Sequence, residues 1–115
     1  MEQHQDNTPS GATAIQARIS NRAQRLHYAL NRLEGCAGEC NGWLTSIMEL
    51  AQQGQTNDKA WLGADESADA LCDEAQDFMR LAAAAYEAAL RLREAVRDAE
   101  CAAADAADKA AGGAL

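Results

Sequence analysis

Apolar residues recur at alternating steps of four and three along two long stretches of the chain, which is the spacing of a heptad seam on an α-helix. The spacing predicts one helix over residues 13–53 and a second over residues 59–110. The first seam runs through Ile19, Ala23, Leu26, Leu30, Leu33, Ala37, Cys40, Leu44, Ile47 and Ala51. The second runs through Trp61, Ala64, Ala68, Leu71, Ala75, Phe78, Ala82, Ala85, Ala89, Leu92, Val96, Ala99, Ala103, Ala106 and Ala110.

Three glycines interrupt the first stretch, but all of them fall on outer positions of the predicted helix. The seam keeps its phase through Gly35, Gly38 and Gly42, although each glycine costs about 1 kcal/mol relative to alanine. We therefore expect one long helix, and a break between residues 35 and 42 is the alternative.

The segments outside the seams are polar and rich in small residues. Residues 54–58 have the composition of a turn, and Asp58 is a candidate N-cap for the second helix. Residues 1–12 hold the only proline and are predicted to form a flexible arm, while residues 111–115 are predicted to fray. The chain is thus expected to be a single helical domain over residues 13–110.

Alternate seam positions of the second helix are mostly alanine, which permits two helices to approach closely. A short turn requires the two helices to run antiparallel, so the sequence predicts an all-α, coiled-coil-like hairpin. The apolar face of each helix is wider than one hairpin can bury, and a second copy would supply the missing layer. We expect a homodimer that forms a four-helix bundle, with an interface that includes Cys72, Phe78, Met79, Leu81 and Tyr86. A monomeric three-helix bundle is the alternative if the first helix breaks.

Charge changes the picture through its distribution. The 115 residues carry a net charge of −8, and residues 35–79 account for it, with nine acidic residues against Lys59 alone. This imbalance argues against direct binding of nucleic acid and favours a protein partner with a basic surface. The predicted partner-binding residues are acidic and closely spaced near the start of the second helix: Asp65, Glu66, Asp69, Asp73, Glu74 and Asp77. No stretch approaches the ~20 apolar residues of a membrane span, so no membrane association is expected.

Catalytic and cofactor motifs are absent from the sequence. It has no Gly-rich phosphate loop, nucleophile elbow or His-Glu-x-x-His motif, and we expect neither an enzyme nor a bound cofactor. The first residues lack the features of a signal peptide, which favours a cytoplasmic protein with reduced cysteines. Cys36, Cys40 and Cys72 converge in a hairpin of this register, so a Cys-based metal or redox bundle is an alternative, although zinc would need a fourth ligand.

The main functional hypothesis is a small acidic interaction module. It would act as a regulator or inhibitor that binds a larger protein, and a nucleic-acid-binding protein is the candidate target. Another alternative comes from Trp61-Leu62-Gly63, which resembles the W-x-G signature of the secreted ESAT-6-like helical-hairpin proteins. The resemblance implies a motif in the turn between two long helices, pairing with a similar protein, and export. The sequence departs from that family in its four cysteines and in Cys101, which precedes Asp105 where the family has a tyrosine.

Overall fold

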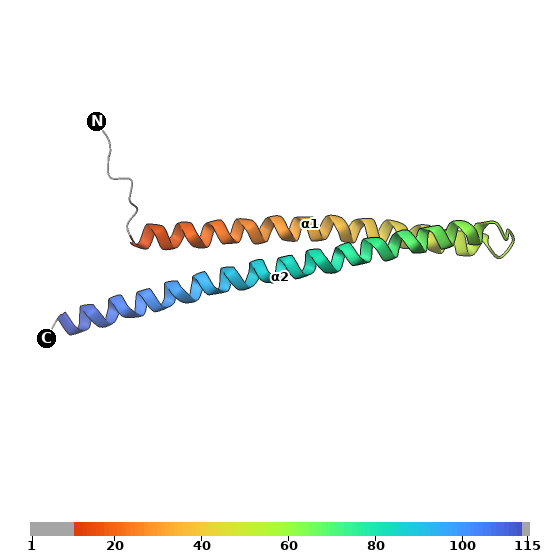
Figure 1. Cartoon of the computed structure of the whole chain (residues 1–115). Coiled ribbons are helices and arrows are strands. Elements are labelled where there is room, and N and C mark those ends of the chain that lie inside the picture. The colour runs from red at the N-terminus through yellow and green to blue at the C-terminus, as the bar shows by residue number, and fades with distance from the viewer. Residues whose placement is uncertain (1–10, 114–115) are drawn as a thin grey trace, which may run out of the picture. The chain divides into compact units, whose positions relative to one another are not determined.

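The computed structural model describes residues 11–113, and these form two long α-helices (Figure 1). Helix α1 spans Gly11–Gln53 and helix α2 spans Ala60–Gly113. Helix α1 starts two residues earlier than the pattern predicts, and α2 continues three residues beyond Ala110. The alanine-rich segment before Ala110 favours the helix, whereas the extension itself contains Gly112 and Gly113, whose low helix propensity does not explain it. The remainder of the expected arm and of the frayed end lies outside the described residues.

Helix α1 is continuous through its three internal glycines. A Cβ atom placed on Gly35, Gly38 or Gly42 would meet nothing within 4 Å, so all three positions face outward. No residue of the described part has a positive φ, and the helix therefore does not bend through a glycine-specific conformation. The alternative of a break at residues 35–42, and the three-helix bundle that depended on it, does not occur.

The described part of the chain divides into two compact units. The turn unit comprises Tyr28–Tyr86, and the terminal unit comprises residues 11–27 with residues 87–113. In the turn unit the two helices run antiparallel. Ser46 Oγ lies 3.3 Å from Ser67 Oγ, and Cys36 Sγ lies 3.4 Å from the carbonyl oxygen of Glu74. These contacts place residues of α1 and α2 side by side when their numbers add up to about 112.

The connection between the helices is closed by backbone hydrogen bonds. The amides of Gly54 and Asn57 donate to the carbonyls of Leu50 and Gln53, which extends α1 by a short turn. Asn57 Oδ1 accepts a hydrogen bond from the amide of Lys59 at 3.1 Å. Asn57, rather than the expected Asp58, therefore satisfies a free amide at the start of α2, because an Asx turn reaches the amide two residues on.

Close packing at the connection depends on two glycines. A Cβ on Gly54 would lie 2.6 Å from Cζ2 of Trp61, and a Cβ on Gly63 would lie 3.3 Å from Cδ1 of Leu50. The indole of Trp61 thus covers Gly54, and Leu50 packs against the backbone of Gly63. Both glycines are used for close approach rather than for chain reversal.

The contact face of the turn unit differs from the predicted seams at every second position. Buried and half-buried residues of α1 include Leu33, Cys36, Cys40, Ile47 and Leu50. Those of α2 include Ala60, Ala64, Ser67, Leu71, Glu74, Phe78, Leu81 and Ala85. The small seam residues Ala37, Ala51, Ala68 and Ala82 are half-buried beside this contact. Four residues that the seams place at the contact are exposed instead: Leu30, Leu44, Trp61 and Ala75. In α1 three neighbouring heptad positions are apolar, and the helices pack through a different pair of them than the seam predicts. In α2 this contact takes in the polar residues Ser67 and Glu74, which the apolar seam left out.

Few residues of the described part of the protein are buried. Among the described residues, those that are buried are Cys36, Gly54, Ala60, Ala64, Ser67, Ala85 and Ala95. No large side chain of this part of the chain is fully buried. The two helices alone therefore provide little of the close-packed core that normally stabilises a domain of this size.

The terminal unit combines a narrow apolar contact with ionic contacts. Ile19 and Leu26 of α1, with Leu92 and Ala95 of α2, are buried or half-buried. Arg18 Nη1 lies 2.9 Å from Asp98 Oδ2, which joins α1 to α2. The predicted seam ends early, because every residue from Glu100 to Gly112 is exposed.

Candidate interaction surfaces

The antiparallel arrangement sorts the residues that flank the contact face onto two sides of the turn unit. Seen from one end, the two helices wind in opposite senses, so flanking positions of the same heptad type lie on the same side. On one side, the apolar side, α1 contributes Leu30, Ala37, Leu44 and Ala51, and α2 contributes Trp61, Ala68, Ala75 and Ala82. The opposite side, the polar side, carries Arg32, Glu39, Ser46 and Asp77.

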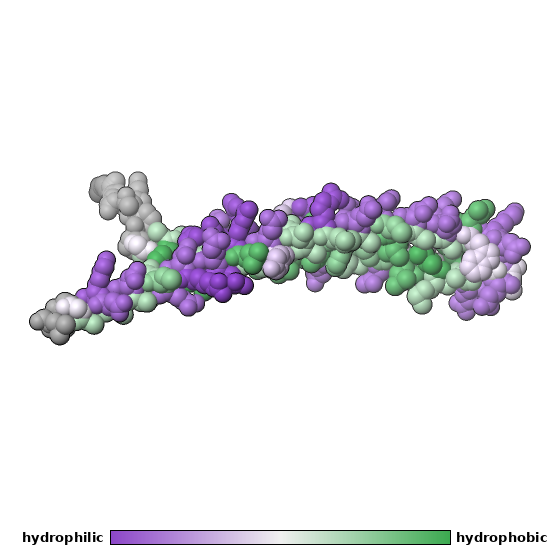
Figure 2. All heavy atoms as spheres, turned by 60° about the horizontal axis from the view of Figure 1, so that its bottom comes forward, coloured by the Kyte–Doolittle hydropathy of each residue, from purple (hydrophilic) through white to green (hydrophobic). Residues whose placement is uncertain are grey.

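The apolar side is open to solvent. Leu30, Leu44 and Trp61 are exposed, and next to them on the outer flank lie Met48, Met79 and Tyr86, which are more exposed still. Figure 2 shows apolar residues of both helices gathered on one face and extending toward the connection. Large exposed apolar side chains gathered on one face are unusual on a monomeric protein and are typical of an interaction site.

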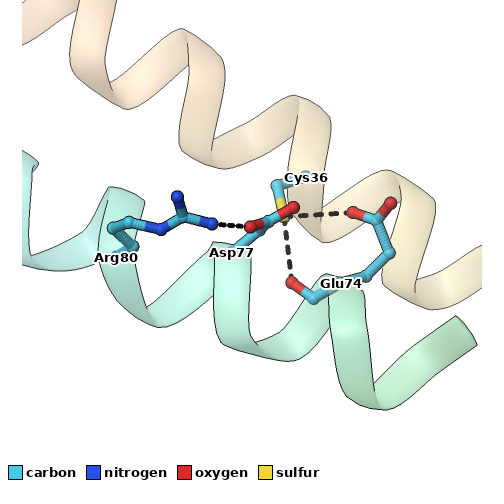
Figure 3. A network of polar contacts seen from close by, with 4 residues as sticks. All are labelled: Cys36, Glu74, Asp77 and Arg80. Atoms are coloured by element: carbon cyan, nitrogen blue, oxygen red, sulfur yellow. Dashed lines mark hydrogen bonds and ion pairs between the residues drawn. The ribbon is translucent and has the colours of Figure 1, made fainter. Parts of the chain in front are cut away.

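The polar side is organised around a buried thiol (Figure 3). Cys36 Sγ lies 3.4 Å from the Glu74 carbonyl oxygen and 3.6 Å from Glu74 Oε2. One turn further along α2, Arg80 pairs with Asp77. These four residues line an open hollow together with Arg32, Leu81 and Ala84.

Burial raises the pKa of the Cys36 thiol, and hydrogen bonding and charge repulsion from Glu74 add to the effect. The carboxylate disfavours a thiolate beside it, since two negative charges would then lie close together. Nucleophilic and metal-binding cysteines need the opposite environment, which lowers the thiol pKa. Cys36 is therefore placed as a packing residue.

The six predicted partner-binding acids occupy different environments. Asp65, Glu66, Asp69 and Asp73 are exposed, and within residues 11–113 none of them has an ion-pair partner. The last two of the six are engaged within the chain: Glu74 is half-buried beside Cys36, and Asp77 is paired with Arg80. Glu66, Asp69 and Asp73 lie on the outward face of α2, away from α1. We call these three residues the acidic face.

The five predicted dimer-interface residues are also divided. Phe78 and Leu81 are half-buried in the contact between α1 and α2. Cys72, Met79 and Tyr86 are exposed and border the apolar side. In place of Phe78 and Leu81, the exposed apolar residues on this side are Leu30, Leu44 and Trp61. The sequence pattern had assigned these three to the contact between the helices.

The cysteines are not grouped as the metal hypothesis required. Cys36 is buried, Cys40 is half-buried, and Cys72 and Cys101 are exposed. In the described part of the chain, no three His, Cys, Asp or Glu side chains are placed so that they could hold a metal ion. Cys72 misses the other two thiols because it lies on the outer flank of α2, whereas Cys36 is in the contact face.

A cation–π contact was not foreseen from the sequence. The Arg32 guanidinium carbon lies 5.9 Å from the centre of the Tyr28 ring, one helical turn away. The spacing of four residues is the only sequence signal for this pair. The contact assigns Arg32 a partner on its own helix.

Comparisons with known proteins return no relative. No protein-family model matches the chain, and no curated protein or solved structure is significantly similar to it. Neither helix contains a segment in residues 11–113 that is long and apolar enough to cross a bilayer. The functional interpretation therefore depends on the surfaces described above.

Proposed function

We propose that the protein is a helical interaction module that binds a larger protein through the acidic face of α2. The observation that carries the proposal is that Glu66, Asp69 and Asp73 are exposed, share one face and have no ion-pair partner in the described residues. Acidic side chains spaced by three and four residues repel one another, so a partner that supplied positive charge would relieve this repulsion. The proposed role is that of a regulator or inhibitor whose target presents a basic surface.

The charge distribution supports binding through the turn unit. Residues 35–79 carry the net charge of −8, so the electric field of the protein is strongest around the turn unit. A basic target would be attracted to this region, which increases the association rate at low salt. Many basic surfaces bind nucleic acid, and occupation of such a surface would exclude DNA or RNA from the target.

The proposal is tested by affinity capture from native extract with three baits. The first is the wild-type protein, and the second carries Glu66→Lys, Asp69→Lys and Asp73→Lys. The third is a matched control with Glu87→Lys, Glu94→Lys and Asp105→Lys, which has the same change in net charge at exposed positions of α2 in the terminal unit. Circular dichroism verifies that all three baits remain helical.

The expected result is a specific protein retained by the wild type and by the control, and lost by the acidic-face variant. Its affinity for the purified wild-type protein should fall as salt is added, because exposed charge pairs are screened. Equal retention by all three baits would contradict the proposal. Equal loss with both variants would show that binding depends on net charge alone rather than on the acidic face.

One observation favours a second candidate function. Trp61 and Gly63 of the W-x-G pattern lie at the start of α2, and both make close contacts across the connection, with Gly54 and Leu50. The resemblance to secreted ESAT-6-like proteins would thus place the pattern where that family carries it. This candidate predicts export of the chain together with a similar protein, and detection of the chain in culture supernatant would support it over a cytoplasmic regulator.

A further inference from the structure

The apolar side of the turn unit has the area of a protein interface. Its six large side chains are exposed to 46–71%: Leu30, Leu44, Met48, Trp61, Met79 and Tyr86. With roughly 200 Å² for a full side chain of this size, they expose on the order of 700 Å². A standard-size interface buries about 800 Å² on each partner, so one such partner would cover the side completely.

Large and small residues lie beside each other on the apolar side. The register of the helices places Leu30 beside Ala82, Leu44 beside Ala68, and Trp61 beside Ala51. In these three layers one helix presents a large side chain and the other an alanine, while the layer of Ala37 and Ala75 has an alanine on both helices. A second copy related by a two-fold rotation would therefore place its large residues opposite the alanines of the first copy.

The eight positions that define the apolar side carry no charge, and the acidic face points away from it. The basic partner proposed above would not be selected by this surface. The surface that binds here must instead be uncharged and apolar, with its residues spaced in heptads. The apolar side of a second copy of the chain has all three properties. The net charge of −8 opposes association only weakly here, since the exposed acids remain in water.

We propose that two copies of this chain pack through their apolar sides, with Leu30 and Leu44 of each copy inserted into the alanine trough of α2 of the other. The dimer completes the core that a single copy lacks, since no large side chain in residues 11–113 is fully buried. The interface is independent of the acidic face, which stays available to another protein.

The test is the molar mass of the full chain in solution, measured by light scattering after size exclusion. The wild type is expected at twice its chain mass of 12.2 kDa. A variant with Leu30→Glu and Leu44→Glu is expected at the mass of one chain, because four carboxylates would be buried per dimer. The matched control carries Thr45→Glu and Gln52→Glu, which add the same charge at exposed outward positions of α1 and should leave the dimer intact.

A second measurement covers the case in which the double leucine variant unfolds. In a Trp43→Phe background, Trp61 is the remaining tryptophan, and its emission should shift to the blue as the protein is concentrated. A wild type that remains a single chain up to about 100 μM would overturn the proposal, since standard-size interfaces bind at about 1 μM or tighter. A dimer that survives Leu30→Glu with Leu44→Glu, or an emission that does not change with concentration, would also overturn it.

Discussion

The indole of Trp61 lies directly over Gly54, so that a Cβ atom at Gly54 would be 2.6 Å from Cζ2 and 2.9 Å from Cδ2 of the ring. Gly54 is buried, and the six-membered part of the indole occupies the space that any other residue would fill. The pair fixes the geometry of the connection, because Trp61 stands at the start of α2 and Gly54 follows the last residue of α1.

Gly54→Ala is expected to destabilise the protein by about 1–3 kcal/mol, the usual cost of overpacking a filled site. The rigid indole cannot move aside as a flexible side chain would. Urea unfolding followed by circular dichroism measures the change in the free energy of unfolding. An unchanged midpoint would mean that Trp61 does not occupy this position in solution.

The outward glycines of α1 should respond in the opposite direction. Gly35→Ala, Gly38→Ala and Gly42→Ala should each stabilise the helix by about 1 kcal/mol, since a Cβ at these positions meets nothing. The same urea titration provides the measurement, and Gly54→Ala is the matched comparison. A loss of stability at Gly35, Gly38 or Gly42 would show that this part of α1 is covered by a partner.

Thiol reactivity should separate the cysteines. Cys36 is buried and its pKa is raised, whereas Cys72 and Cys101 are exposed, so Cys36 should react last with a thiol reagent. Three variants, each retaining one of these cysteines and no other, allow the rates to be compared at one pH. A rate for Cys36 as fast as that for Cys101 would contradict the buried placement.

The raised thiol pKa also predicts a loss of stability in alkali. Above about pH 8.5, the ordinary thiol range, the unfolded chain releases the Cys36 proton while the folded chain retains it. The unfolded state then binds fewer protons, so the free energy of unfolding falls as the pH rises. Urea midpoints measured from pH 7 to 10 should decline more steeply for the wild type than for Cys36→Ala.

The ion pair between Arg18 and Asp98 should contribute little. Its side chains are 37% and 57% exposed, and pairs in such positions are typically worth 1 kcal/mol or less. A double-mutant cycle with Arg18→Ala and Asp98→Ala should give a coupling energy of this size that decreases at high salt. A larger, salt-resistant value would require the pair to be shielded from water.

The helical nature of the protein follows from local properties that the sequence states directly. Steps of four and three, outward glycines and a polar segment after Gln53 predict two long helices joined by a short turn, and α1 and α2 are such helices. These features depend on residues close together in the chain, where the α-helix imposes a fixed geometry. The acidic residues near the start of α2 could be identified from the sequence for the same reason.

The tertiary structure decided which apolar residues remain outside. Helix α1 has three adjacent apolar heptad positions, and the contact face of α2 takes in the polar residues Ser67 and Glu74, so apolar periodicity alone cannot show which positions face the neighbouring helix. The contacts of Trp61 with Gly54, Leu50 with Gly63, and Cys36 with Glu74 fix the rotation of the helices. That rotation withdraws Glu74 from the acidic face and leaves Leu30 and Leu44 exposed, because the choice depends on contacts between residues far apart in the chain.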